Sequence, residues 1–364
     1  MNDVFLILEN GMVFKGRAFG YDGEAVGELV FSTGMTGYLE TLSDSAYYGQ
    51  IVMQTFPLVG NYGIISEDFD PLTAQLKAYI VRDWCQEPSN FRSEGNLDSF
   101  LREKKIPGIF DIDTRKLTRI IREQGSMNAM ISKNEKLTDE QRKALKSYRI
   151  KDAVSNCAGT AAKIPDSLCC GEAKSGDFEY CVSLWDFGGA YRLSKLLGKN
   201  GICVNKTLAF DAKAEELCSP EVKGIVLSGG PGDPAENTDI INEIKKLLDR
   251  KIPILAVGLG HQMLALACGA KTGKLKFGHR GANQAVKQVD STRCFITAQN
   301  HGYVVMADSL PENAAQYYVN VNDGTCEGII YEEIPALSVS FEPNGEVFSK
   351  FKSMMGGGCT NASK

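Results

Sequence analysis

Residues 256–262, Ala-Val-Gly-Leu-Gly-His-Gln, have the spacing of a nucleophile elbow but carry no nucleophile. An apolar run at 252–257 leads through this turn into helical sequence that starts near His261. The central residue of such an elbow is Ser or Cys, which stands above the sheet beside the N–H groups of the next helix. Here the central residue is Gly258, which has no side chain to react. The spacing is also typical of an ordinary strand-to-helix turn. Under either interpretation we expect no covalent catalysis there.

Two other segments combine glycine with polar side chains. Residues 227–234, Leu-Ser-Gly-Gly-Pro-Gly-Asp-Pro, follow an apolar run directly. Their glycines would let the backbone approach an anion and present N–H groups to it, but a tight turn at a sheet edge explains them equally well. Residues 299–303, Gln-Asn-His-Gly-Tyr, follow a β-prone run at 295–298 and form either a pocket wall or an ordinary turn. The three segments indicate a pocket without identifying a reaction.

The elements that would position these segments alternate along the second half of the chain. Apolar runs at 180–185, 224–228 and 252–257 are separated by helical sequence. A helix over 239–250 would place its apolar residues on one face: Ile240, Ile241, Ile244, Leu247 and Leu248. This alternation predicts a mostly parallel sheet flanked by helices, with ligands at the carboxyl ends of the strands.

The first half has a different pattern. Its β-rich runs lie at 4–8, 27–32 and 50–55, and one clear helix begins at Asp113 or Thr114 and ends at Gly125. The small, polar residues 157–177 have the composition of a linker. We therefore predict an α/β protein with four segments: a mixed α/β domain at 1–156, a linker at 157–177, a second α/β domain at 178–355 and a flexible tail at 356–364.

The composition is that of a globular protein. Hydrophobic residues make up 43% and charged residues 23% of the 364, and the net charge of -5 without a dense basic block argues against nucleic-acid binding. No apolar run reaches the roughly 18 to 20 residues of a membrane span, and the start lacks a signal-peptide pattern. The 11 cysteines include no Cys-x-x-Cys pair. We expect a cytoplasmic protein that binds no metal, nucleic acid or membrane.

Ordered segments along almost the whole chain resemble the small, glutamine-hydrolysing subunit of carbamoyl-phosphate synthetase. In the first half the similar segments are 26–31, 35–40, 90–92 and the specific Asp-Ile-Asp-Thr-Arg-Lys-Leu-Thr-Arg at 111–119. In the second half they are 228–234, 259–262, 276–283 and 299–303. The resemblance implies a class I glutamine amidotransferase domain in the second half. In that family an elbow Cys, with a His and a Glu near the C-terminus, releases ammonia from glutamine.

The resemblance also implies a glutamine-like pocket and shows where its chemistry is missing. The pocket positions are Gly230, Gly232, Leu259, Gln262, Asn300, Gly302 and Tyr303. The family's nucleophile falls on Gly258, its His on Glu342 and its Glu on Asn344, while Ala46 replaces a glutamine-contacting Ser. The chain has only three histidines, and each belongs to another family motif, so none is left as a base. Cys268 lies about 15 Å further along the helix and cannot substitute.

We therefore expect a catalytically inactive small-subunit-like protein, a pseudoenzyme without a cofactor of its own. In a heterodimer it would scaffold or regulate a large synthetase subunit, a ligase that uses ATP, bicarbonate and free ammonia to make carbamoyl phosphate for pyrimidine or arginine biosynthesis. An alternative is a regulatory protein without a synthetase role whose pocket binds an amino acid, with Glu342 favouring a cationic group. A third possibility is a divergent enzyme that uses Asp233, Asn300, His301 and Glu342.

Overall fold

The chain divides into two compact units, which we call the first and second units. A computed structural model describes residues 2–69, 74–158 and 179–356. The first unit comprises residues 1–153 and 276–283, and the second comprises 154–275 and 284–364. Most of the expected linker, residues 159–177, and most of the expected tail, residues 357–364, lie outside the described residues.

The segment 276–283 belongs to the first unit, whereas the sequence placed it inside a continuous second domain. The backbone N–H of Ser126 donates to the carbonyl of Lys276 at 2.7 Å. The ring of Phe277 stacks on that of Phe31 with centroids 5.9 Å apart. These contacts join residues that are far apart in the sequence, so no local sequence pattern indicates them.

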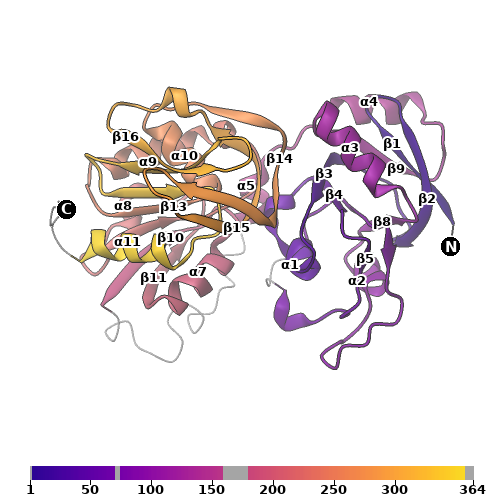
Figure 1. The fold of residues 1–364 in the computed structure, drawn as a ribbon, viewed down its shortest axis with the longest axis horizontal. Helices are drawn as coiled ribbons and strands as arrows, with labels where there is room; N and C mark the ends of the chain where they lie inside the picture. The colour runs from indigo at the N-terminus through magenta and orange to yellow at the C-terminus, as the bar shows by residue number, and fades with distance from the viewer. Residues whose placement is uncertain (1, 70–73, 159–178, 357–364) are drawn as a thin grey trace. The chain divides into compact units, whose positions relative to one another are not determined.

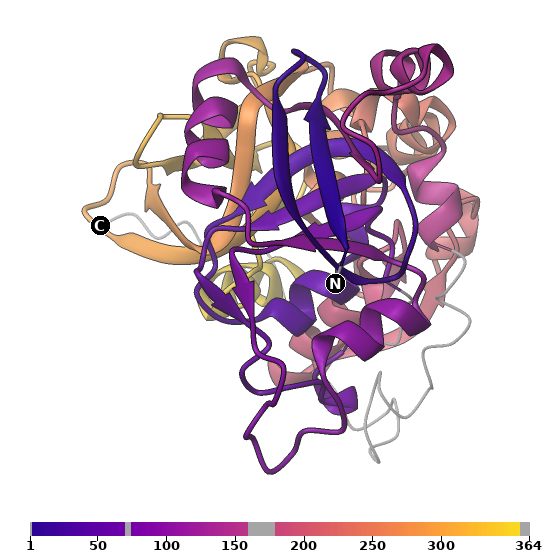
Figure 2. The ribbon, with the colours of Figure 1, turned by 90° about the vertical axis from the view of Figure 1, so that its right-hand side faces the viewer.

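The first unit is built on a closed barrel of seven strands, in the order β1-β2-β8-β6-β4-β3-β9 (Figure 1). The strands are β1 (Asp3–Leu8), β2 (Val13–Gly20), β3 (Ala25–Ser32), β4 (Gln50–Gln54), β6 (Ala78–Ile80), β8 (Pro107–Phe110) and β9 (Met127–Ser132). The antiparallel hairpin of β1 and β2 is drawn in indigo in Figure 2. Alternating apolar residues of these strands, such as Leu6, Leu29 and Ile109, form one buried core cluster. The three β-rich runs predicted in this half are strands β1, β3 and β4.

Short helices and a two-stranded pair accompany the barrel. They are α1 (Tyr38–Ser43), η1 (Ser45–Tyr47), β5 (Leu58–Val59), η2 (Ser66–Asp68), β7 (Asp83–Trp84), α2 (Leu97–Glu103), α3 (Thr114–Gln124) and α4 (Asp139–Ser147). The predicted helix at 114–124 is confirmed as α3. The Asp113 carboxylate accepts the N–H of Lys116 at 2.9 Å, and Gly125 ends the helix at φ 95°. Leu117, Ile120 and Ile121 lie in the barrel core cluster.

The second unit contains a nine-stranded sheet in the order β11-β10-β12-β13-β18-β17-β15-β14-β16. Its strands are β10 (Tyr180–Trp185), β11 (Ile202–Leu208), β12 (Gly224–Leu227), β13 (Ile254–Val257), β14 (Thr272–Gln288), β15 (Cys294–Val305), β16 (Ala314–Asn320), β17 (Cys326–Tyr331) and β18 (Ala336–Val339). Strands β11, β10, β12, β13 and β18 are parallel neighbours, as predicted. The expected mostly parallel sheet is extended by antiparallel strands beyond β18.

Helices cover both faces of the parallel part of this sheet. The described helices from residue 153 onward are α5 (Ala153–Cys157), α7 (Ala190–Lys199), α8 (Ala214–Leu217), η5 (Pro234–Glu236), α9 (Thr238–Leu248), α10 (Leu259–Ala267), η6 (Ala307–Ser309) and α11 (Gly345–Met355). One core cluster contains the apolar residues of α8, α9 and α10, and the other contains those of α7 and α11. Among the described residues, no helix has the length and apolar content needed to span a bilayer.

Replacing the cap of α3 should lower stability without changing the fold. Asp113→Ala removes the acceptor for the Lys116 N–H. We expect the free energy of unfolding to fall by about 1 kcal/mol, because an unsatisfied helix N-terminus costs that much. Urea denaturation followed by circular dichroism measures the change. Asp113→Ser, which retains an acceptor, is the matched control and should lose much less; equal losses in both variants would contradict the capping role.

Candidate functional site

Three loops of the second unit begin where neighbouring parallel strands end. Strand β12 leads into residues 228–233, β13 into Gly258, and β18 into residues 340–344. Strands β12, β13 and β18 are consecutive in the sheet, so the three loops lie side by side at its carboxyl edge. This edge is where open α/β sheets hold their ligands. We call these three loops the candidate site.

The backbone at Gly258 keeps the conformation of a nucleophile elbow. Its φ is 54° and its ψ is -114°, a region that side-chain-bearing residues rarely adopt. The Gly258 N–H donates to Val339 O at 2.8 Å, and the Gly260 N–H donates to Ser228 O at 3.0 Å. The turn is therefore fixed to both adjacent strands. Helix α10 begins at Leu259 rather than near His261, because the helical conformation starts directly after this turn.

The glycine-rich loop after β12 is positioned by packing within the unit. Strand β12 lies between β10 and β13, so this loop leaves an interior strand of the sheet. A Cβ at Gly230 would lie 2.1 Å from the carbonyl oxygen of Phe187, so only glycine fits there. The Ser228 hydroxyl accepts the Phe187 N–H at 2.8 Å. The close approach of the two backbone segments therefore requires glycine at position 230, whether or not a ligand binds there.

Residues 299–303 are part of strand β15, so their interpretation as an ordinary turn between strands is wrong. Thr297, Gln299 and His301 are buried, while the residues between them are less so. This is the period of two that a strand requires. The sequence obscured it because the buried face of β15 is polar here instead of apolar.

The predicted pocket residues of the second unit lie on the loop after β12, on the first turn of α10 and on β15. Besides the bond from Gly260 to Ser228, a side-chain hydrogen bond joins two of these elements: the buried Gln262 side chain donates to Tyr303 O at 2.7 Å. Gly232 lies in the loop at φ 91°, and Asn300 and Gly302 lie on β15 beside Tyr303. Ala46 lies in η1 of the first unit.

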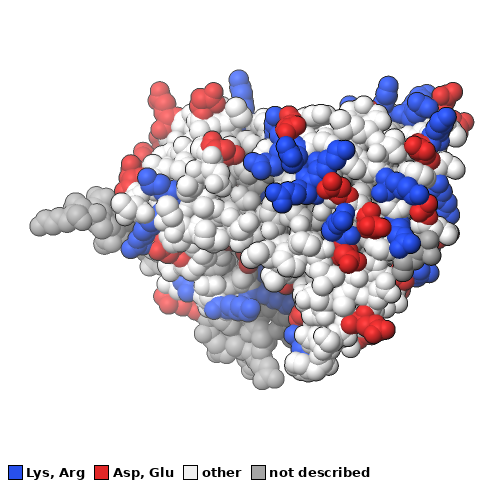
Figure 3. All heavy atoms as spheres, turned by 45° about the vertical axis from the view of Figure 1, so that its right-hand side comes forward, with Lys and Arg blue, Asp and Glu red and all other residues white. Residues whose placement is uncertain are grey.

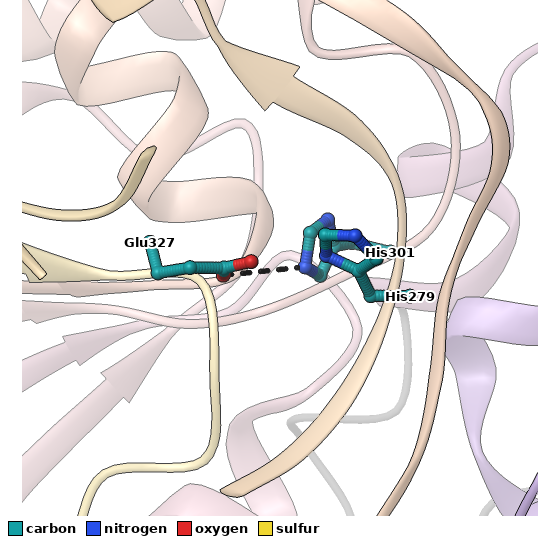
Figure 4. Close-up of side chains that lie close together, drawn as sticks. All are labelled: His279, His301 and Glu327. Carbon is teal, nitrogen blue, oxygen red and sulfur yellow. Dashed lines mark ion pairs between the residues drawn. The ribbon is translucent and has the colours of Figure 1, made fainter. Parts of the chain in front are cut away.

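A buried carboxylate, missed in the sequence, accompanies His301. The Nε2 atom of His301 lies 3.5 Å from an oxygen of Glu327 on β17, a pair shown by the dashed line in Figure 4. The Asn320 amide donates to Glu327 at 3.1 Å, and the Ser340 hydroxyl donates to the same carboxylate. His301 Nδ1 lies 2.9 Å from Tyr303 O. The only sequence signal for Glu327 was its charge, since the rest of the run Cys-Glu-Gly-Ile-Ile-Tyr contains no other charged residue.

His261 is buried and is not available as a base. Its Nδ1 atom lies 2.8 Å from the Ser338 hydroxyl. Burial lowers the pKa of the imidazole to about 3, an effect reinforced by His301 and opposed by Glu327. The imidazole is therefore neutral at pH 7 and packs within the sheet–helix interface.

The two positions that would carry the family's base both have other contacts. The Glu342 carboxylate pairs with Arg192 Nε on α7 at 3.0 Å. The Asn344 side chain accepts the N–H groups of Glu346 and Val347, at 3.1 Å each, and so caps α11. The sequence predicted that Glu342 would attract a cation, and the cation in the structure is the chain's own Arg192. Nothing near Arg192 in the sequence indicated this pairing.

Neither Cys268, which the sequence excluded as a substitute nucleophile, nor Cys294 lies in the three loops of the candidate site. Cys268 is the C-cap of α10, at the opposite end of the helix from Gly258. Burial raises the pKa of its thiol to about 11, so it is protonated at neutral pH. Cys294 is exposed at the start of β15.

Comparison with known proteins identifies the family of this chain. Residues 6–131 match the carbamoyl-phosphate synthase small chain, CPSase domain, and residues 184–348 match glutamine amidotransferase class-I. The chain is 45% identical over 338 residues to the carbamoyl phosphate synthase small chain of Clostridium perfringens, with 93% of each chain covered. This chain belongs to the carbamoyl-phosphate synthase small chain family.

Other carbamoyl phosphate synthase small chains are also similar in sequence to this chain over nearly their full length. The small chain of Listeria monocytogenes is 40% identical over 367 residues, with 98% of each chain covered. The small chain of Archaeoglobus fulgidus is 41% identical over 343 residues, covering 93% of this chain and 92% of its own. Among solved structures, a glutamine amidotransferase from Thermotoga maritima aligns with 48% of this chain and 81% of its own at 18% identity and a TM-score of 0.36. The fold class predicted from the sequence, α/β with a class I glutamine amidotransferase-like second domain, is confirmed by the family match and the parallel sheet.

A buried aspartate beside the candidate site should make stability depend on pH. Asp186 accepts the N–H groups of Gly188 and Ala190 at 2.7 and 3.2 Å. Burial nevertheless raises the pKa of its carboxyl from 3.8 to about 6. The folded state therefore binds the proton more tightly than the unfolded state, and this contribution to stability is lost as pH rises from about 4 through 6.

Asp186→Asn removes this charge and retains an acceptor oxygen. We expect the free energy of unfolding of this variant to exceed that of the parent chain by at most ~3 kcal/mol at pH 7. The difference should disappear below pH 4. Urea denaturation of both proteins between pH 4 and 7.5 measures the difference. The lowered pKa of His261 has the opposite pH dependence: it makes the folded state less stable as pH falls below 6.5. Both proteins contain His261, so this effect cancels when their free energies of unfolding are compared. A difference that does not vary with pH would contradict the assignment.

Proposed function

We propose that this chain is a non-hydrolysing small subunit of carbamoyl-phosphate synthase. It would scaffold or regulate a large subunit that makes carbamoyl phosphate from free ammonia, bicarbonate and ATP, for pyrimidine or arginine biosynthesis. The observation that carries the proposal is Gly258, a residue without a side chain held in the elbow conformation at φ 54°. Membership in the small chain family supports the pairing with a large subunit.

The chemistry of glutamine hydrolysis requires atoms that the candidate site does not offer. A thiolate must attack the amide carbon, and a base must first accept the thiol proton. At the nucleophile position Gly258 carries only hydrogen, and at the base position Glu342 is paired with Arg192. The buried His261 is held neutral against Ser338. Loss of a nucleophile and its base lowers an enzyme's rate by on the order of 10^6.

The alternative of a ligand-binding protein without a synthetase role is less well supported. That hypothesis relied on Glu342 attracting a cationic group of the ligand. In the structure Arg192 already contacts this carboxylate at 3.0 Å. A cationic ligand would have to displace an ion pair within the chain, which favours the synthetase subunit.

An assay of the assembled enzyme tests the proposal. The chain is co-expressed with the large subunit of its own source, and carbamoyl phosphate synthesis is measured with either glutamine or ammonium as nitrogen donor. We expect synthesis with ammonium and none above background with glutamine, because no thioester can form at Gly258. An intact small chain such as that of a relative, assembled in the same way, is the positive control. Synthesis from glutamine, or failure of the two chains to associate, would refute the proposal.

Restoring the three lost groups should recover little glutaminase activity while Arg192 remains. In Gly258→Cys with Glu342→His and Asn344→Glu, the new imidazole would face the guanidinium that Glu342 now neutralises. A nearby positive charge disfavours the imidazolium that a general base must become. Adding Arg192→Ala should therefore raise glutamine hydrolysis about tenfold above the triple variant. Ammonia release is the measurement, Gly258→Cys alone is the control, and equal rates with and without Arg192 would show that the ion pair is irrelevant.

A further inference from the structure

Three polar side chains of the second unit lie together in its interior. Gln299 and His301 are two residues apart on β15, so they project from the same face of that strand. Glu327 lies on β17, the neighbouring strand of the sheet. The Nε2 atom of His301 is 3.3 Å from Gln299 Oε1 and 3.5 Å from a carboxylate oxygen of Glu327, the pair drawn in Figure 4. We call these three side chains the Gln-His-Glu cluster.

The cluster contains a carboxyl group that is shielded from water. Figure 3 shows acidic and basic side chains on one face of the surface, where water solvates their charge. Glu327, in contrast, is 0% exposed, and His301 and Gln299 are only 8% and 4% exposed. An ionised carboxylate in such a place is costly unless a positive charge neutralises it. The cluster therefore requires either a cation or an extra proton.

Hydrogen bonds determine which atoms of the cluster face one another. His301 Nδ1 lies 2.9 Å from Tyr303 O, which can only accept, so Nδ1 carries a proton and Nε2 of the neutral ring presents its lone pair. Gln299 Nε2 donates to Thr297 Oγ1 at 3.1 Å, so the amide oxygen of Gln299 is the atom turned toward His301. An amide oxygen and a carboxylate oxygen therefore both face an imidazole nitrogen, and all three are electron-pair donors.

The distances at His301 Nε2 fit a zinc ion better than a hydrogen bond. An N–H···O hydrogen bond joins atoms about 2.7 to 3.2 Å apart, and one between charged groups is shorter still. Both distances, 3.3 and 3.5 Å, exceed that range. In a tetrahedral zinc site with bonds of about 2.0 to 2.2 Å, neighbouring ligand atoms are about 3.3 to 3.6 Å apart. The two observed distances agree with that separation.

The surrounding hydrogen bonds are those that metal ligands usually make. A metal-binding histidine typically donates its other ring N–H to a carbonyl, as His301 Nδ1 does to Tyr303 O. A ligating carboxylate is typically held by further donors, and Glu327 accepts from the Asn320 amide at 3.1 Å and from the Ser340 hydroxyl. These bonds fix the orientation of both side chains before any ion binds.

His261 on α10 provides an independent observation. Its ring is fully buried, and its Nε2 atom has no hydrogen-bond partner among the residues that the structure describes. Its Nδ1 atom is bonded to Ser338, and both Glu327 and His301 affect its imidazole electrostatically, so the ring lies near the cluster. A buried polar atom of this kind is usually satisfied by an ordered water, and Nε2 could bond a water held by a metal ion.

We propose that the Gln-His-Glu cluster binds one zinc ion through His301 Nε2, Gln299 Oε1 and a carboxylate oxygen of Glu327. A water in the fourth position completes the tetrahedron. Imidazole and carboxylate are usual zinc ligands, whereas Ca²⁺ and Mg²⁺ require six or more ligands, nearly all oxygen. The ion would join β15 to β17 and stabilise the strand that carries the pocket positions 300–303. The expectation of no metal rested on cysteine spacing, which does not bear on a site built from two strands.

Zinc content and zinc-dependent stability of the full chain test this site. The chain is produced in medium with and without added Zn²⁺, because a buried site is filled as the chain folds. We expect one zinc per chain by inductively coupled plasma mass spectrometry, and a melting temperature several degrees higher with zinc. In Glu327→Gln the zinc affinity, measured by competition with a chelator, should fall at least about a hundredfold. Glu243→Gln is the matched control, since it removes another buried carboxylate of the same unit, paired with Lys246, and should retain the parent's affinity.

Further measurements separate the other outcomes. Co²⁺ in place of zinc reports the geometry, because tetrahedral Co²⁺ absorbs visible light much more strongly than six-coordinate Co²⁺ at a surface. If Glu327→Gln does not fold, Ser340→Ala takes its place and should weaken zinc binding about tenfold. Absence of zinc from the parent chain, a six-coordinate cobalt spectrum, or unchanged affinity in the variant overturns the site. His301 and Glu327 would then share a proton instead. None of these outcomes bears on the proposed function, which is measured with the large subunit.

Discussion

The backbone hydrogen bonds at Gly258 and Gly260 hold the candidate site together. One reaches Val339 at the end of β18 and the other reaches Ser228 at the end of β12. These bonds fix the start of α10 over the carboxyl edge of three neighbouring strands, and so they also fix the positions of Leu259 and Gln262. The elbow conformation at φ 54° thus persists in a residue that gains no chemistry from it. Strand pairing and helix packing require this turn independently of the side chain that it carries.

Each position that the family uses for catalysis has a structural contact in this chain. Gly258 joins strands, Glu342 pairs with Arg192, and Asn344 caps α11. An ion pair that is about a third exposed at its carboxylate adds little stability by itself, on the order of 1 kcal/mol or less. Any other role for Glu342 would nevertheless require displacement of Arg192.

The buried polar groups of the second unit are held by contacts within that unit. Glu327 is fully buried, and its carboxyl group accepts hydrogen bonds from Asn320 and Ser340 and lies beside His301. Asp186 is similarly buried beside the glycine loop and bonds two backbone N–H groups. Removing one partner from such a group is costlier than removing the whole arrangement, because a buried polar group is then left unpaired. These networks explain why the site's framework is retained although its nucleophile is absent.

The sequence by itself determined which residues stand at the family's catalytic positions and where most elements lie. Three histidines, each within another motif, and a glycine at the elbow are the observations behind our proposal that this chain does not hydrolyse glutamine. Strands β10 and β12 and helices α3 and α9 followed from periodicity and caps, because those signals come from residues that are close in the chain. Only the tertiary structure decided the closure of the first barrel, the strand conformation of residues 299–303 and the pairing of Arg192 with Glu342. Each of these depends on partners far apart in the sequence, which no local pattern can specify.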